Sequence, residues 1–136
     1  MPATRVAVVD DHQLVRIGLK QIIEGQPDFA WAGEAKSGRE ALALLRTAQC
    51  DVLLLDLSLP DMSGLDVLRQ IKAHHEAVAT LVLSSYPENQ YGLNVLRAGA
   101  SGFVSKTADD AELCRAIRAV VRRRGLGRRS APVKVR

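Results

Sequence analysis

The sequence contains few cysteines and no long hydrophobic segment. Its 136 residues include only Cys50 and Cys114, whose separation matches neither a metal-binding nor a redox motif. We therefore expect two reduced, inert thiols. No apolar run approaches the roughly 20 residues of a transmembrane helix, and residues 1–11 lack the regions of a signal peptide. These absences favour a cytoplasmic protein without a membrane partner.

Acidic residues are absent from the last fifteen positions, 122–136, which hold seven of the nineteen Lys and Arg residues. The remaining 121 residues therefore carry twelve basic and fifteen acidic residues, a net charge of −3. The overall charge of +4 reflects a basic end and does not mark the globular part as a nucleic-acid binder. We expect one domain over residues 1–121, and a basic linker or disordered tail over 122–136.

Short apolar runs alternate along the chain with longer segments whose apolar residues recur every three or four positions. This pattern predicts five strand–helix pairs. The expected strands cover residues 5–10, 29–35, 51–56, 79–85 and 102–106. The expected helices carry their apolar positions over about 14–23, 41–48, 65–71, 88–98 and 113–121. Ser37 followed by Glu40 predicts a capping box at the start of the second helix.

The first, third and fourth expected strands are apolar almost throughout, as is typical of strands covered by helices on both faces. Right-handed strand–helix–strand units of this length predict an α/β protein with a doubly wound parallel sheet. The flavodoxin-like strand order 2-1-3-4-5 is the expected topology, with five strands and five helices.

Polar residues stand where four of these strands end. They are Asp10 and Asp11 at the end of the first strand, Asp56 at the end of the third, Ser84 and Ser85 at the end of the fourth, and Lys106 at the end of the fifth. Ligands of doubly wound sheets bind beyond the carboxyl ends of the strands, near the switch in strand order. The sequence therefore predicts three carboxylates, a hydroxyl and an ammonium group at one edge of the sheet.

Three carboxylates in one cleft repel one another unless a cation compensates them. Mg²⁺ fits this set best, because it takes oxygen ligands and retains waters that a phosphoryl group can replace. A nearby lysine suits the other phosphoryl oxygens. Since a carboxylate can attack phosphorus, Asp56 is the candidate nucleophile. Taken singly, each Asp could instead cap a helix or turn the chain.

Four segments resemble the receiver domain of two-component response regulators. They are VVDDH at 8–12, DLSLPDMSG at 56–64, LSS at 83–85 and GASGFVSK at 99–106. DDHQLVRIGL, GEAKSGREAL and RAGASGFVSK resemble more narrowly the NarL/FixJ group, whose members typically carry a LuxR-type helix-turn-helix domain. No such domain fits after Val121, so the resemblance implies a receiver without its effector domain.

The resemblance also implies a role for individual residues. Asp56 would be the phosphoacceptor and a Mg²⁺ ligand. Asp11 would bind Mg²⁺ directly, Asp10 largely through water, and Ser58 through its backbone carbonyl. Lys106 would pair with the phosphoryl group.

Two further residues would report phosphorylation. Ser84 would move to hydrogen-bond the phosphoryl group, and Phe103 would turn inward as Ser84 moves. Phe103 stands where many receivers have Tyr, and Thr107 follows Lys106 where many have Pro.

The implied function is a switch that a sensor histidine kinase phosphorylates and that acts through homodimerisation and DNA binding by the missing domain. It would be a signalling domain and not an enzyme, with weak self-phosphorylation and autodephosphorylation. The alternatives are a single-domain receiver or phosphorelay module, a receiver-like module that only binds partners, and an aspartyl-phosphate phosphohydrolase. Such hydrolases use a second Asp two residues after the nucleophile, where this chain has Ser58.

Overall fold

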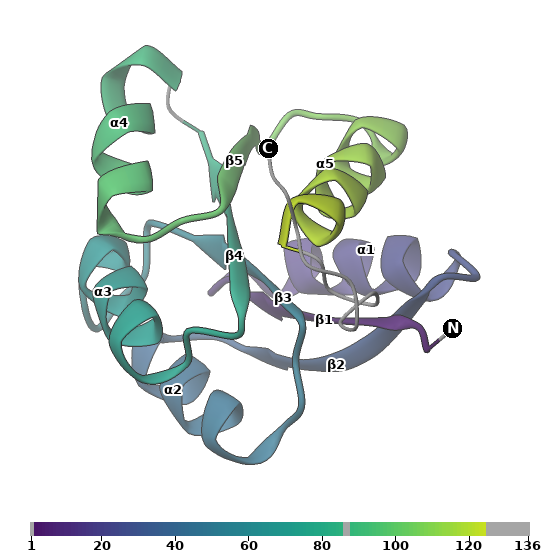
Figure 1. Ribbon diagram of the computed structural model, residues 1–136, viewed down its shortest axis with the longest axis horizontal. Helices are drawn as coiled ribbons and strands as arrows, with labels where there is room; N and C mark the ends of the chain where they lie inside the picture. The colour runs from purple at the N-terminus through teal and green to yellow at the C-terminus, as the bar shows by residue number, and fades with distance from the viewer. Residues whose placement is uncertain (1, 86–87, 125–136) are drawn as a thin grey trace.

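Five parallel strands form one sheet between two layers of helices (Figure 1). The computed structural model describes residues 2–85 and 88–124, except the side chains of 88–92. The strands are β1 (Thr4–Val9), β2 (Phe29–Ala35), β3 (Val52–Asp56), β4 (Ala79–Ser84) and β5 (Gly102–Ser105), in the order β2-β1-β3-β4-β5. The helices are α1 (Gln13–Glu24), α2 (Gly38–Thr47), α3 (Gly64–His74), α4 (Glu88–Ala98) and α5 (Asp110–Arg124). The predicted α/β class and strand order are confirmed.

The two faces of the sheet carry separate apolar cores. Along β1, Val6 and Val8 pack toward α1 and α5, whereas Ala7 and Val9 pack toward α2 and α3. Because successive side chains of a strand point to opposite faces, a strand covered on both sides is apolar at every position. The same alternation divides all four apolar residues of β3, which are fully buried. Each such side chain contributes about 1.5–3 kcal/mol relative to exposure.

The predicted capping box forms at the start of α2. Ser37 Oγ accepts a hydrogen bond from the Glu40 N–H at 3.1 Å. The Glu40 carboxylate in return accepts one from the N–H of Lys36, at 3.0 Å, one residue earlier than in the standard box.

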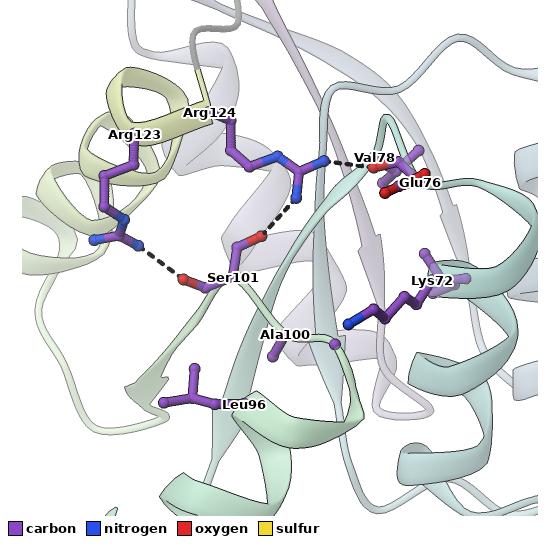
Figure 2. A pocket seen from close by; sticks show the side chains of 10 residues that line it. Lys72, Glu76, Val78, Leu96, Ala100, Ser101, Arg123 and Arg124 are labelled. Atoms are coloured by element: carbon purple, nitrogen blue, oxygen red, sulfur yellow. Dashed lines mark hydrogen bonds between the residues drawn. The ribbon is translucent and has the colours of Figure 1, made fainter. Parts of the chain in front are cut away.

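The basic residues near the C-terminus extend α5 to Arg124, three residues past the boundary expected at Val121. Arg123 donates to the Ser101 carbonyl at 2.7 Å, and Arg124 to the Glu76 carbonyl (Figure 2). Cations also favour the negative end of a helix dipole. These bonds hold the last turn of α5 over a cavity of about 340 Å³ between the ends of α3, α4 and α5. Residues 125–136 of the expected tail lie outside the described residues.

The described part of the chain has no helix that is both long and apolar enough to span a membrane.

Substitutions of two glycines by alanine should have opposite effects on stability. Gly99 has φ +121°, and a Cβ there would lie 2.9 Å from Cδ of Lys72. We therefore expect Gly99→Ala to lower the free energy of unfolding by about 1–3 kcal/mol. Gly18 lies within α1, where a Cβ would meet nothing within 4 Å. Gly18→Ala should raise the free energy of unfolding by about 0.5–1 kcal/mol. Urea denaturation measures both, and equal signs would contradict the structure.

The thiol of Cys50 should react slowly with alkylating reagents in the folded protein. Burial raises the pKa of Cys50 to about 12, and its Sγ lies 3.2 Å from the Val52 carbonyl, to which it donates. At pH 8 roughly one thiol in ten thousand would be ionised, and the thiolate is the reactive form. We expect the Cys50 peptide to be alkylated by iodoacetamide far more slowly in buffer than in urea, as measured by mass spectrometry. Comparable rates would contradict the raised pKa.

Candidate functional site

The carboxyl ends of β1 and β3 bring two buried carboxylates together at the point where the strand order switches. Val9 pairs with Leu55, so Asp10 and Asp56 follow at neighbouring ends of the two strands. Both residues are almost inaccessible, with 0% and 2% of their surface exposed. Such a pair of buried like charges requires compensation.

Asp56 is held through both of its carboxylate oxygens. Oδ1 accepts a hydrogen bond from the Ser58 N–H at 3.1 Å, and Oδ2 accepts one from Nζ of Lys106 at 3.2 Å. Burial raises the pKa of Asp56, and the charge of Asp10 raises it further. The Ser58 and Lys106 bonds oppose this shift without cancelling it. The carboxylate is therefore fixed in orientation but is not fully stabilised as an anion.

Lys106 supplies the positive charge shared by the two buried carboxylates. It follows β5, and its backbone N–H donates to the Ser84 carbonyl at 3.0 Å. Its Nζ lies 3.1 Å from Asp10 Oδ2 and 3.2 Å from Asp56 Oδ2. Burial alone would lower the pKa of Lys106, but the bonds and charges of the two carboxylates raise it above its ordinary value. The ammonium group stays charged.

His12 belongs to the same cluster, although the sequence indicated only a residue at a helix start. It does precede α1 as its N-cap. Its backbone N–H donates to Asp10 Oδ1 at 2.8 Å, and its Nδ1 lies 2.8 Å from that oxygen and 3.1 Å from Asp11 Oδ1. The Asp10 bond and the charges of both carboxylates raise the pKa of His12. In the sequence, the only sign that His12 would join the carboxylate cluster was its position directly after two Asp residues.

The hydrogen bonds of His12 explain why the two buried carboxylates differ. Burial would raise the pKa of Asp10, but the His12 bonds together with Lys106 lower it below its usual range. Asp10 is therefore the more readily ionised member of the pair, and its negative charge acts on Asp56.

The acidic cluster fits a hard divalent cation. Ligand atoms of Asp10, Asp11, His12 and Asp56 all lie within 4.8 Å of one another. Oδ2 of Asp10 is buried. Among the described residues, it forms an ion pair with Nζ of Lys106 but accepts no well-oriented hydrogen bond. Three carboxylates offer the oxygen ligands that Mg²⁺ prefers, and Asp11 is partly open to solvent.

The three other predicted site residues lie around this cluster. Ser84 ends β4 next to β3, with 9% of its surface exposed, one position after the partner of Asp56. Phe103 pairs with Val82 and packs, half-buried, against the core on the α2 and α3 side. Ser58 is exposed in the loop after β3. The structure therefore brings Asp10, Asp11, Asp56 and Lys106 into one cluster and places Ser84 at its edge. Phe103 lies outside the cluster, within β5 and three residues before Lys106.

Comparison with known proteins identifies the family. Residues 6–118 match the model of the response regulator receiver domain. The response regulator UvrY of Escherichia coli is 39% identical over 115 residues, which are 85% of this chain and 53% of UvrY. The DNA-binding transcriptional activator DevR/DosR of Mycobacterium tuberculosis is 38% identical over 116 residues, 85% of this chain and 54% of that protein. The chain thus spans about half the length of these curated relatives.

A solved structure supports the same assignment. A two-component response regulator of the LuxR family from Aurantimonas sp. superposes with a TM-score of 0.80 at 36% identity, covering 88% of this chain and 85% of that one. The resemblance of the sequence motifs to receivers of LuxR-type regulators is therefore confirmed. The chain belongs to the response regulator receiver domain family.

Proposed function

We propose that this receiver stores a signal as a phosphoryl group on Asp56. The observation that carries the proposal is the contact of one ammonium group, Nζ of Lys106, with the buried carboxylates of both Asp10 and Asp56. This arrangement leaves a carboxylate oriented by two hydrogen bonds beside a group suited to phosphoryl oxygens. The chemistry is phosphoryl transfer from a sensor histidine kinase.

In the proposed transfer, a carboxylate oxygen of Asp56 attacks the phosphorus of a phosphohistidine. The new O–P bond forms as the P–N bond breaks, and the imidazole nitrogen retains the electron pair of that bond. Lys106 then pairs with an oxygen of the transferred group in place of the Asp56 oxygen. Hydrogen bonding by the Ser58 N–H keeps the other Asp56 oxygen in place during the attack.

Mg²⁺ is the proposed cofactor, held by Asp10, Asp11, Asp56 and the backbone carbonyl of Ser58. The excess of negative charge in the cluster supports this choice, because the buried Asp10 oxygen shares the single ammonium group of Lys106 with Asp56. When bound, Mg²⁺ supplies positive charge that offsets the charge on the transferring phosphoryl group.

The proposed switch comprises Ser84 and Phe103. Ser84 lies at the edge of the cluster and would hydrogen-bond the phosphoryl group, while Phe103 lies on the adjacent β5. Coupled movement of the two would change the surface formed by α4, β5 and α5. Phosphorylation would shift the equilibrium between the resting and the moved conformation only through contacts that differ between these two conformations.

The proposed output is transcriptional. The relative DevR/DosR is a DNA-binding transcriptional activator about twice the length of the matched segment. We assign the receiver to residues 1–121 and a basic linker or disordered tail to 122–136, of which residues 122–124 continue α5. Phosphorylation would favour a homodimer of a cytoplasmic regulator, and a helix-turn-helix domain would bind DNA.

The site favours storage of the phosphoryl group over turnover of substrates. Ser58 stands where an aspartyl-phosphate phosphohydrolase has its second carboxylate, and its N–H already donates to Asp56. A general base for rapid attack by water is therefore lacking at that position. The chain would act as a signalling domain, with slow loss of its phosphoryl group.

Incubation with acetyl phosphate and Mg²⁺ should add one phosphoryl group that hydroxylamine removes, because acyl phosphates react with that nucleophile. Asp56→Asn should abolish the labelling, and EDTA should reduce it strongly. Intact-protein mass spectrometry measures the gain. Asp66→Asn, at an exposed carboxylate of α3, is the matched control and should be labelled like the parent chain. Equal labelling of Asp56→Asn would refute the assignment.

Asp56→Asn should also stabilise the metal-free protein at neutral pH. The substitution removes one buried negative charge and keeps an oxygen for the Ser58 N–H. We expect the melting temperature to rise by about 4 °C, equal to roughly 1 kcal/mol in a domain of this size. Saturating Mg²⁺ should reduce the difference, since the cation binds the parent better. A lower melting temperature of the metal-free variant would show that the carboxylates do not repel one another appreciably.

A further inference from the structure

The loop after the phosphoacceptor is attached to the start of α2 through Asp61. Oδ1 of Asp61 accepts a hydrogen bond from the Gly38 N–H at 2.8 Å, and Oδ2 accepts one from the Arg39 N–H at 3.0 Å. The first N–H groups of a helix have no partner within the helix. Both oxygens of this carboxylate are therefore used to join two segments more than twenty residues apart in sequence.

Met62 adds a close packing contact at the same junction. A Cβ at Gly38 would lie 2.3 Å from Cγ and 2.6 Å from Sδ of Met62, so only glycine admits this approach. Met62 is also packed against the core between the sheet and α2 and α3. The loop is thus held on α2 by two hydrogen bonds and an adjacent apolar contact.

The rest of the loop is held at both of its ends. The Ser58 N–H donates to Asp56 Oδ1 at 3.1 Å. At the far end, a Cβ at Gly64 would lie 2.6 Å from Cα of Leu57, so the start of α3 abuts the backbone next to Asp56. Ser58 therefore lies in a short segment whose position depends on Asp56, on Gly64 and on the attachment to α2.

Capping of α2 does not by itself account for Asp61. Ser37 already caps this helix from its own chain segment, by accepting from the Glu40 N–H. Asp61 instead accepts from the N–H groups of Gly38 and Arg39, which precede Glu40 and do not donate to Ser37. The additional effect of the Asp61 bonds is on the loop, because they restrict the backbone that carries Ser58.

We propose that Asp61 is a positioning residue for the divalent cation: its bonds to Gly38 and Arg39 hold the loop so that the Ser58 carbonyl faces the cation bound by Asp10, Asp11 and Asp56. This inference rests on the proposed function and extends it to a residue that does not itself contact the phosphoacceptor cluster. Outer groups that orient metal ligands commonly have such an effect on metal affinity.

The test compares three variants by calorimetric titration of the unphosphorylated protein with Mg²⁺. Asp61→Ala removes the attachment from the loop side, and Gly38→Ala displaces Met62 from the α2 side without changing the loop sequence. Ser37→Ala is the matched control, because it weakens the same helix start without touching the loop. Melting temperatures of all three variants show how much stability each one loses.

Asp61→Ala and Gly38→Ala should weaken Mg²⁺ binding by about tenfold, whereas Ser37→Ala should change it by no more than about twofold at a similar loss of melting temperature. Asp61→Asn, which keeps one acceptor oxygen, should lie between Asp61→Ala and the parent chain. The Mg²⁺ concentration that gives half the maximal rate of labelling by acetyl phosphate should shift in the same order.

The positioning role is overturned if Asp61→Ala and Gly38→Ala bind Mg²⁺ as Ser37→Ala does, or if the parent chain binds no Mg²⁺. A parent chain that binds Mg²⁺ but gains no phosphoryl group from acetyl phosphate overturns the proposed function alone. The two failures are therefore separate observations.

Discussion

Two buried carboxylates that share one ammonium group are the constraint on which the rest of the site depends. Burial of an ionised group without a partner costs several kcal/mol, so Asp10 and Asp56 require Lys106 close to both. Lys106 reaches them across the end of β4, where its own N–H donates to the Ser84 carbonyl. One positive charge for two negative ones leaves an excess that a bound cation would offset. The resting site is therefore only partly compensated.

The parallel sheet satisfies this constraint because it gathers strand ends from distant parts of the chain at one edge. β1 and β3 are neighbours, so Asp10 and Asp56 meet without any long loop. The cores on both faces hold these strands rigidly, since every residue of β3 is buried. Loops then carry the groups that contact the carboxylates: Ser58 after β3, His12 before α1 and Lys106 after β5. Apolar packing thus stabilises an arrangement of charges that would be unfavourable by itself.

Much of the fold could be predicted because its signals are local and periodic. The strand at 29–35 matches β2 in full, and the boundaries of the other four strands agree to within one residue. The residues that end the apolar runs supplied Asp10, Asp11, Asp56 and Lys106, which the structure brings together. The structure extends α5 beyond Val121, where the sequence predicted its end because Arg123 and Arg124 have the composition of a basic tail. Their carbonyl partners lie in other segments, which periodicity does not identify.

The sequence by itself determined the element order, the two-sided burial of the central strands and the identity of the polar residues at their ends. These properties depend on side-chain chemistry at fixed spacings along one strand or helix. The tertiary structure alone decided that Asp61 holds the loop against α2, and that Arg123 and Arg124 bond to the carbonyls of Ser101 and Glu76. Such contacts join segments whose separation follows no period, so they exist only once the sheet and helices have packed.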